Sequence, residues 1–260
     1  MAEEQNPFSA LNDFEAVSLQ QLDGVKLMNR VDQKFILHQR ELNSLLLEIQ
    51  EYYNVLEINE KRIFRYSSLY YDTDEQNFYS DHHNGKPNRI KIRSREYLDT
   101  GTAFFEIKKK IKGFRTEKYR VEKSGDQLSD QHSERELLKM HHLDHIPLVP
   151  SIIVDYSRIS ISAKDLSERV TIDTELCFKK ESGEESMAGL VIIEVKQDQV
   201  KRESPIVQAL RKRRNRPFGI SKYAMGMVLM NAAIKTNAFR HKVSKIKQLI
   251  SRNGANRRSE

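Results

Sequence analysis

The feature that most constrains this chain is a strand-like segment, residues 88–97, in which cations alternate with isoleucines. Its sequence, Asn-Arg-Ile-Lys-Ile-Arg-Ser-Arg-Glu-Tyr, separates Ile90 and Ile92 from the ladder Arg89, Lys91, Arg93, Arg95 and Tyr97. Successive side chains of a strand point to opposite faces, so the segment predicts one basic face and one apolar face. Taken alone, it is equally typical of a solvated face on a half-buried sheet.

Two following segments, residues 103–111 and 115–123, repeat this separation. One face carries the acid Glu106 and four cations, Lys108, Lys110, Lys118 and Arg120. The other face carries the apolar residues Phe105, Ile107, Tyr119 and Val121. Gly101 and Gly113 lie in the connections, which predicts hairpins. Three consecutive strands with a shared basic face indicate a common polyanion-binding cavity.

The other strand-like segments are residues 27–37, 63–71, 151–161, 168–178 and 189–196. About eight strands in all is the number at which an antiparallel sheet can close, which also removes its edges. We therefore expect an α+β, mainly antiparallel fold: a closed eight-stranded barrel with flanking helices. Helices are expected at residues 39–53, near Phe78 and at 133–143, 204–213 and 220–235, the last two covering Ile92, Ile107, Val121 and Ile193.

Composition indicates a folded protein with an anionic partner. The 38% hydrophobic content permits a core, and 44 Lys and Arg against 37 Asp and Glu give a net charge of +7. The single cysteine, Cys177, fits a reducing compartment. Without a signal-peptide pattern or an apolar stretch of membrane-spanning length, we expect a soluble, cytoplasmic protein.

The chain is expected to divide into an N-terminal helical arm (1–25), one β-rich domain (26–235) and a basic C-terminal tail (236–260). Val243, Ile246, Leu249 and Ile250 recur in the tail at helical spacing between cations. This pattern is typical of a helix on an anionic membrane surface, and a solvated tail is the alternative. In the first case, the tail would tether the domain to the inner membrane face near an integral-membrane partner.

The expected inward-facing cations outnumber the interleaved acids. Buried cations need acids, water or an anionic ligand, and phosphate oxygens would supply the missing charge. The acids are Asp32, Glu106, Glu122, Asp173 and Glu194, and the cations are Lys34, Lys91, Arg93, Arg95, Lys108, Lys118, Arg120, Arg158, Arg169, Lys196 and Lys222.

An ordered set of motifs along most of the chain resembles the VTC-type polyphosphate polymerase domains, within the CYTH or triphosphate tunnel metalloenzyme superfamily. The motifs are Arg30-Val31-Asp32-Gln33-Lys34-Phe35, Tyr71-Asp72-Thr73, Arg93-Ser94-Arg95-Glu96-Tyr97, Glu106-Ile107-Lys108, Tyr156-Ser157-Arg158, Ile172-Asp173-Thr174, Ile193-Glu194-Val195-Lys196 and Ser221-Lys222-Tyr223. The resemblance implies that residues 26–235 form an eight-stranded tunnel with basic walls, which holds a triphosphate and a growing polyphosphate chain.

The resemblance also implies roles for single residues. The catalytic phosphate-binding set would be Lys34, Arg93, Arg95, Lys108, Arg158 and Lys222, with further phosphate contacts from Lys91, Lys118, Arg120, Arg169, Lys196 and Ser221. Glu194 resembles the family's metal-binding glutamate and suits Mn²⁺ or Mg²⁺, which take carboxylate and phosphate oxygens. Its alternative role is an ion pair with Lys196 or with an arginine of the barrel interior, and the alternative for Ser221 is to cap the following helix.

The first strand distinguishes between reactions. The superfamily's hydrolases resemble Glu-x-Glu-x-Lys, whereas this chain has Arg30 in place of the first acid. Loss of an acid weakens the positioning of a nucleophilic water, while a phosphate nucleophile mainly needs to be held in line by cations. We predict an ATP-dependent polyphosphate polymerase, a phosphotransferase. The alternatives are an inorganic or organic triphosphatase, and a non-catalytic polyphosphate or nucleotide sensor that would not need Glu194.

Two weaker patterns are expected to be solvent-exposed and without a functional role. His82-His83 and His141-His142 with His145 are expected to be solvated, because adjacent histidines without cysteine partners are weak metal motifs. The basic run at residues 211–216 is expected to be a solvated face, since no nucleic-acid-binding motif accompanies it. We therefore expect no specific nucleic-acid partner.

Overall fold

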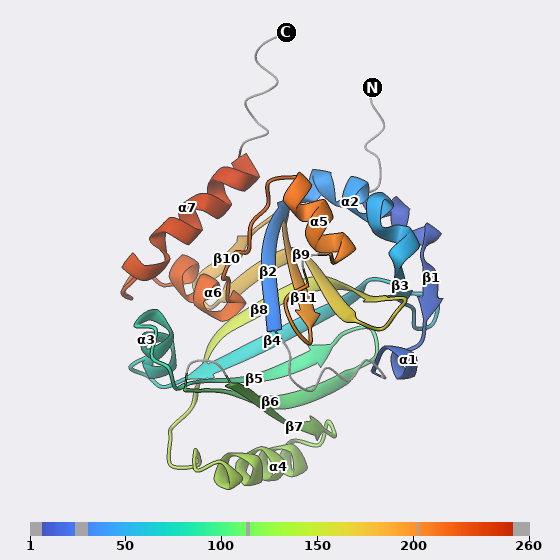
Figure 1. Ribbon diagram of the computed structural model, residues 1–260. Coiled ribbons are helices and arrows are strands. Elements are labelled where there is room, and N and C mark those ends of the chain that lie inside the picture. Colours follow the sequence, from blue (N-terminus) through green and yellow to red (C-terminus); the bar gives the residue numbers. More distant parts are fainter. Residues whose placement is uncertain (1–6, 24–30, 113–114, 202, 252–260) are drawn as a thin grey trace.

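The fold is known from a computed structural model, which describes residues 7–23, 31–112, 115–201 and 203–251. Its centre is one curled, mainly antiparallel sheet with the strand order β2-β11-β9-β8-β4-β5-β6-β7 (Figure 1). These strands are β2 (Val31–His38), β4 (Phe64–Asp72), β5 (Arg89–Tyr97), β6 (Thr102–Ile111), β7 (Arg115–Lys123), β8 (Val149–Ala163), β9 (Glu168–Lys180) and β11 (Leu190–Gln197). Three short strands extend the sheet: β1 (Glu15–Val17), β3 (Tyr53–Leu56) and β10 (Gly183–Ser186).

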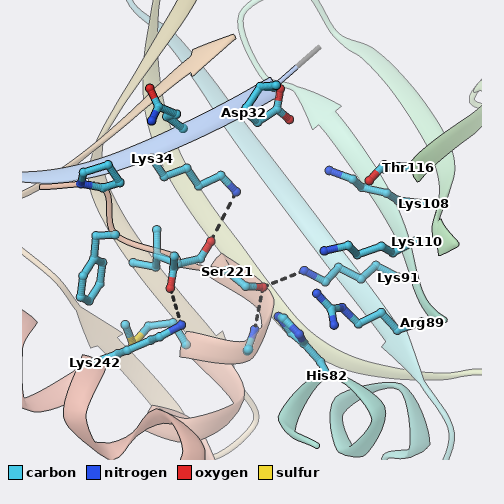
Figure 2. A pocket seen from close by; sticks show the side chains of 18 of the residues that line it. Asp32, Lys34, His82, Arg89, Lys91, Lys108, Lys110, Thr116, Ser221 and Lys242 are labelled. Atoms are coloured by element: carbon cyan, nitrogen blue, oxygen red, sulfur yellow. Dashed lines mark hydrogen bonds between the residues drawn. The ribbon is translucent and has the colours of Figure 1, made fainter. Parts of the chain in front are cut away.

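Closure of the sheet was expected, and the structure supports it only in part. The hydrogen-bonded path begins at β2 and ends at β7, and no pairing joins these two strands within the described ranges. The sheet nevertheless curls far enough that Asp32 of β2 and Thr116 of β7 line the same cavity (Figure 2). The mainly antiparallel α+β class is therefore confirmed, whereas a closed barrel is not.

Seven α-helices within the described ranges surround or enter the sheet. They are α1 (Leu19–Asp23), α2 (Leu42–Ile49), α3 (Asn77–His83), α4 (Gln127–Met140), α5 (Pro205–Lys212), α6 (Lys222–Met230) and α7 (Asn237–Ser251). The expected N-terminal arm contains a 3-10 turn, Ser9–Asp13, followed by β1 and α1. Leu11 and Phe14 of this arm are buried against the main core.

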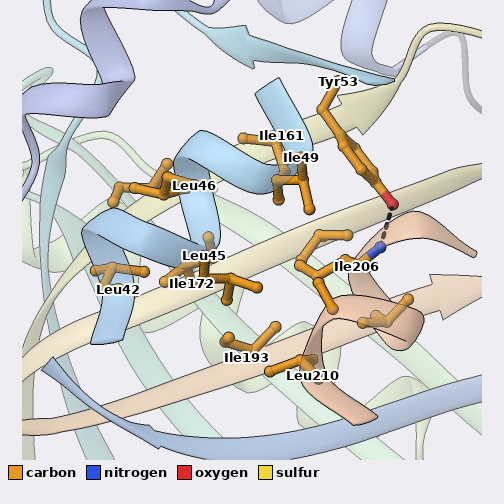
Figure 3. Packing of buried hydrophobic residues seen from close by; sticks show 14 of the residues in the cluster. Leu42, Leu45, Leu46, Ile49, Tyr53, Ile161, Ile172, Ile193, Ile206 and Leu210 are labelled. Atoms are coloured by element: carbon orange, nitrogen blue, oxygen red, sulfur yellow. Dashed lines mark hydrogen bonds between the residues drawn. The ribbon is translucent and has the colours of Figure 1, made fainter. Parts of the chain in front are cut away.

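Helices α2 and α5 cover the outer face of β2, β11, β9 and β8 (Figure 3). Leucine and isoleucine recur every three or four residues in α2, so they form one stripe that faces the sheet. The stripe consists of Leu42, Leu45, Leu46 and Ile49, all fully buried. Each such side chain contributes about 1.5–3 kcal/mol by leaving water.

The outer face of β5, β6 and β7 is covered by a different helix from the one that was expected. Ile92 and Ile107 are fully buried and share a cluster with Leu137 of α4. Val121 packs at the edge of that cluster, and only Ile193 lies under α5 as predicted. The expectation that α5 and α6 would cover all four residues was therefore wrong.

Helix α6 instead packs against the inner face of the sheet. The inner side of β2 and β11 is charged at Lys34 and Glu194 but apolar two residues further, at Ile36 and Ile192, which lie in one cluster with Met225 of α6. Close contact is possible because residue 226 is glycine, where a Cβ would lie only 2.6 Å from side chains of β8 and β9. Thus α6 fills the apolar part of the concave side.

The C-terminal helix α7 is folded onto the domain. Ile246 is buried, and Val243, Leu249 and Ile250 pack against the same cluster as α6. These are the residues predicted to face a membrane, so the apolar stripe has a partner within the protein. None of the helices in the described part of the chain is long and apolar enough to cross a membrane. The last tail residues, 252–260, lie outside the described ranges.

Candidate active site

Strand register places the predicted cations in rows across the inner face. Lys108 of β6 pairs with Lys91 of β5 on one side and with Lys118 of β7 on the other. The next row contains Arg93, Glu106 and Arg120 in the same order. The alternation seen in the sequence therefore produces adjacent like charges, which repel one another unless anions lie between them.

These rows lead into a cavity of about 1380 Å³ between β2, β5, β6, β7, α6 and α7 (Figure 2). Among the described residues, seven cations line it: Lys34, Arg89, Lys91, Lys108, Lys110, Arg115 and Lys242. The lining acids are Asp32, Glu117 and Asp198. The cavity wall is thus strongly basic, and the lysine side chains of β2 and of β5–β6 extend toward one another across it.

Beyond the cavity lining, the buried acids of the inner face are already paired with cations. The carboxylate of Glu106 accepts a hydrogen bond from Arg93 Nε at 2.7 Å and lies 2.5 Å from Lys118 Nζ. Burial alone would raise its pKa, but the charges of Arg93, Arg95 and Lys118 hold the pKa of Glu106 at about 2. Glu106 therefore keeps its charge and orients two of the predicted phosphate-binding residues.

Asp173 of β9 likewise pairs with two of the predicted phosphate-binding residues. Arg158 donates two hydrogen bonds to its carboxylate, at 2.6 and 2.9 Å, and Lys222 donates a third. Burial opposes the charge of Asp173, yet Arg158 and Lys222 hold the pKa of its carboxyl well below the usual range. Such a fork-like arrangement fixes the direction of the guanidinium group.

Glu194 lies between two lysine side chains on the inner face of the sheet. Its two carboxylate oxygens lie 3.4 Å from Lys34 Nζ and 3.4 Å from Lys196 Nζ. Burial acts against its charge, but Lys196 and Lys34 keep its pKa well below the ordinary value. No group of three or more His, Cys, Asp or Glu residues with metal-site geometry occurs in the described ranges. The carboxylate oxygens of Glu194 are the kind of donor that a hard divalent cation takes.

Lys91 and Lys108 differ from these paired cations, because no acid within the described ranges forms an ion pair with either. Burial, followed by the charges of Lys108 and Lys34, lowers the pKa of Lys91 well below its ordinary value. Burial also lowers the pKa of Lys108, where Lys34 adds to the effect and Glu194 opposes it. A bound anion would stabilise both charged forms.

Aromatic rings hold the deeper arginines. Tyr66 and Tyr156 stack with ring centroids 5.2 Å apart, and the Arg158 guanidinium lies 5.3 Å and 5.2 Å from the two centroids. Arg95 lies at 5.7 Å from the Tyr66 ring and is almost fully buried, while Lys222 Nζ is 4.3 Å from the Tyr156 ring. Cation–π contacts of this kind stabilise partly desolvated charges without cancelling them.

The structure thus places the predicted residues in distinct positions. Lys34, Lys91, Lys108 and Ser221 line the cavity. Outside that lining, Arg93, Arg95, Arg158 and Glu194 lie on the same face of the sheet, and Lys222 is the first residue of α6. Arg169 and Lys196 are paired in register on β9 and β11. Arg120 is exposed on β7, with its guanidinium 4.5 Å from the centroid of the Phe104 ring.

Ser221 caps α6, and its expected contact with phosphate stays a prediction. Its hydroxyl accepts a hydrogen bond from the backbone N–H of Ala224, which caps α6, and another from Lys91 Nζ at 2.8 Å. The cap fixes the hydroxyl at the cavity wall. Arg30, on which the distinction between hydrolase and polymerase partly depended, lies outside the described residues.

Sequence reasoning did not select several residues of the wall. Alternation placed Arg89 and Lys110 on the basic face, but they were not selected as site residues, and nothing local marks Lys242. The expectation of a solvated His82 was wrong: its ring is largely buried beside the cavity, and burial with the charges of Lys91 and Arg89 lowers its pKa to about 3. The next residue in the sequence, His83, accepts a hydrogen bond from the Ala238 N–H at the start of α7.

Comparison with known proteins adds one family and several solved structures. A family model described as VTC domain matches residues 29–231. A proposed adenylate cyclase from Bacillus halodurans is 14% identical over 75% of this chain and 96% of its own, with a TM-score of 0.49. A proposed adenylyl cyclase from Hippeastrum, described as having a dominant triphosphatase activity, is 13% identical over 76% and 94%, with a TM-score of 0.47.

A third structure, a protein from Pyrococcus horikoshii, is 16% identical over 77% of this chain and 98% of its own, with a TM-score of 0.43. No curated protein sequence matches the chain.

Proposed function

Because the chain belongs to the VTC domain family, we propose that it is a polyphosphate polymerase, which transfers the γ-phosphoryl group of ATP to a growing inorganic polyphosphate chain. The observation that carries this proposal is the pair Lys91 and Lys108. They are neighbours in register and line the cavity, and neither forms an ion pair with an acid in the described ranges; desolvation in the cavity wall lowers the pKa of both. A site built this way gains free energy when a chain of phosphates enters it.

The roles follow from the geometry. Lys34, Lys91, Lys108 and Ser221 would bind phosphate oxygens at the cavity wall. The deeper catalytic set of Arg93, Arg95, Arg158 and Lys222 would neutralise charge on the reacting groups, with Lys118, Arg120, Arg169 and Lys196 as further phosphate contacts. In-line phosphoryl transfer depends mainly on such positioning and charge neutralisation.

Glu194 would hold Mn²⁺ or Mg²⁺. The metal, when bound together with phosphate, supplies positive charge to the oxygens of the transferred group. Displacing Lys34 and Lys196 from Glu194 would free both ammonium groups for phosphate oxygens, because each lies 3.4 Å from the carboxylate. Glu194 would therefore bind the metal only when phosphate is also present to take over the two lysines.

The state of three acids beyond the cavity lining supports transfer to phosphate over hydrolysis. Glu106, Asp173 and Glu194 each contact two cations, and the pKa of each is lowered. A carboxylate held in this way is a poor proton acceptor, so it is unsuited to activate water. A phosphate acceptor is already anionic and needs no such base.

Cytoplasmic location, an integral-membrane partner and attachment through the basic tail stay predictions. The apolar stripe of α7 packs on the domain itself, so a membrane contact would have to use the exposed cations of this segment. No specific nucleic-acid partner is proposed.

The proposal is tested by incubation with ATP and Mn²⁺, followed by electrophoresis of the products. Wild-type protein should form polyphosphate, and Glu194→Gln should lose metal-dependent turnover while its affinity for tripolyphosphate stays within a few-fold, since the basic wall is intact. Glu184→Gln, which removes one exposed carboxylate on β10, is the matched control. Full metal-dependent activity in Glu194→Gln would show that this residue is not the metal ligand.

A further inference from the structure

Lysines from three elements converge on one short segment, Gly219-Ile220-Ser221, just before α6 (Figure 2). Lys34 Nζ of β2 lies 3.4 Å from the middle carbonyl oxygen of this segment, and Lys91 Nζ of β5 lies 2.8 Å from the serine hydroxyl oxygen. Lys242 Nζ of α7 donates a hydrogen bond of 2.6 Å to the glycine carbonyl oxygen. Three residues span at most about 11 Å, so the three acceptors are close together.

The partners of these lysines hold the ammonium groups without neutralising them. A carbonyl or hydroxyl oxygen accepts a hydrogen bond but carries no net charge, and Lys34 alone of the three also contacts an acid within the described ranges. Burial lowers the pKa of Lys242, and burial with neighbouring cations lowers that of Lys91. All three ammonium groups contact the same three-residue segment, so an anion bound beside it would be attracted by each of them.

Lys242 comes from a part of the chain that the family match does not include. The match ends at residue 231, whereas α7 begins at Asn237 and contributes Phe239 and Lys242 to the cavity wall. The helix is firmly placed: His83 accepts a hydrogen bond from its first turn, and Ile246 is buried in the core. The lysine is therefore held at the cavity by packing on both sides of it.

We propose that Lys242 is a phosphate-binding residue, which completes with Lys34 and Lys91 a three-ammonium subsite for one phosphate group at residues 219–221. The inference rests on the proposed function in taking a phosphate chain as the ligand. On binding, each ammonium group exchanges a neutral oxygen for a phosphate oxygen, which is the stronger, charge-assisted hydrogen bond. The C-terminal helix is then part of the substrate site of this protein.

The test is calorimetric titration of the full chain with inorganic tripolyphosphate at two salt concentrations. Lys242→Ala should weaken binding about tenfold, as expected for loss of one hydrogen bond to a charged group, and should reduce the salt dependence of the affinity. Lys242→Arg should stay within about threefold of wild type. Lys247→Ala, which removes an exposed cation from the same helix, should bind like wild type.

Two further measurements keep the outcome decisive. The first is the melting temperature of each variant without ligand, which reports whether α7 stays docked. The second is binding by Lys242→Gln, whose side chain can still donate a hydrogen bond to the glycine carbonyl but lacks the charge. Binding by Lys242→Gln as tight as wild type would overturn the role of Lys242, as would equal binding by Lys242→Ala and Lys247→Ala. Failure of the wild type itself to bind tripolyphosphate would instead overturn the proposed function.

Discussion

Asp173 offers the sharpest test of how the inner face is built. The change Asp173→Asn preserves shape but removes the charge that Arg158 and Lys222 share. Because the carboxylate and both cations are largely buried, two positive charges would then face each other without an acid between them. Removing one partner from a buried ion pair costs about 3–5 kcal/mol of unfolding free energy.

This cost converts into a measurable change in melting temperature. For a protein of this size, about 1 kcal/mol corresponds to about 2–4 °C, so Asp173→Asn should melt about 6–20 °C below wild type. Tripolyphosphate should recover part of the loss and should raise the melting temperature of the variant more than that of wild type. The reason is that its oxygens can take the place of the missing carboxylate beside Arg158 and Lys222.

The assay is thermal unfolding with and without tripolyphosphate, with Asp144→Asn as the control for loss of one exposed acid. The control should melt within about 2 °C of wild type, since surface substitutions usually cost less than about 0.5 kcal/mol. If Asp173→Asn has the same melting temperature as the control, the carboxylate does not hold the two cations in place. An equal ligand-induced rise in wild type and variant would contradict the replacement of carboxylate by phosphate.

Two further predictions concern pH and packing. Burial lowers the pKa of Lys118 to about 8, so the affinity for tripolyphosphate should fall as the pH rises through about 8. In binding titrations from pH 7 to 9.5, Lys118→Arg should show a weaker dependence of affinity on pH. An unchanged pH dependence in this variant would exclude Lys118 from the site. Gly226→Ala should lower the unfolding free energy by about 1–3 kcal/mol in chemical denaturation, because its Cβ would lie 2.6 Å from the side chains of Ile152 and Phe178. An unchanged midpoint would mean that α6 does not depend on this close contact.

Strand alternation was the strongest signal that the sequence offered. It predicted the faces of β5, β6 and β7 residue by residue, because a period of two leaves no freedom once one side must be buried. It could not predict which helix covers which face, since alternation within strands carries no information about the packing of helices distant in the sequence. The placement of α6 on the inner side was visible only indirectly, in the change from charged to apolar residues between Lys34 and Ile36.

The candidate site was less predictable than the fold. Alternation could identify cations on a face but not their partners, and Glu106, Asp173 and Glu194 neutralise some of them while Lys91 and Lys108 have no acid partner in the described ranges. The contribution of α7 depends on long-range packing of Ile246 and on the contact with His83, neither of which leaves a local pattern. For this reason the sequence left a membrane-surface helix and a solvated tail as alternatives, whereas the stripe packs on the domain in the structure.

The central claim is that the cavity directs a phosphoryl group to a phosphate chain in preference to water. It is tested most directly by measuring ADP and free phosphate separately in one reaction with ATP and Mn²⁺, with Glu194→Gln and Glu184→Gln in parallel. We predict that wild type and Glu184→Gln release ADP with far less than one free phosphate per ADP, the remainder being recovered as polyphosphate. One free phosphate for each ADP, with no polyphosphate, would contradict the account and identify the protein as a triphosphatase.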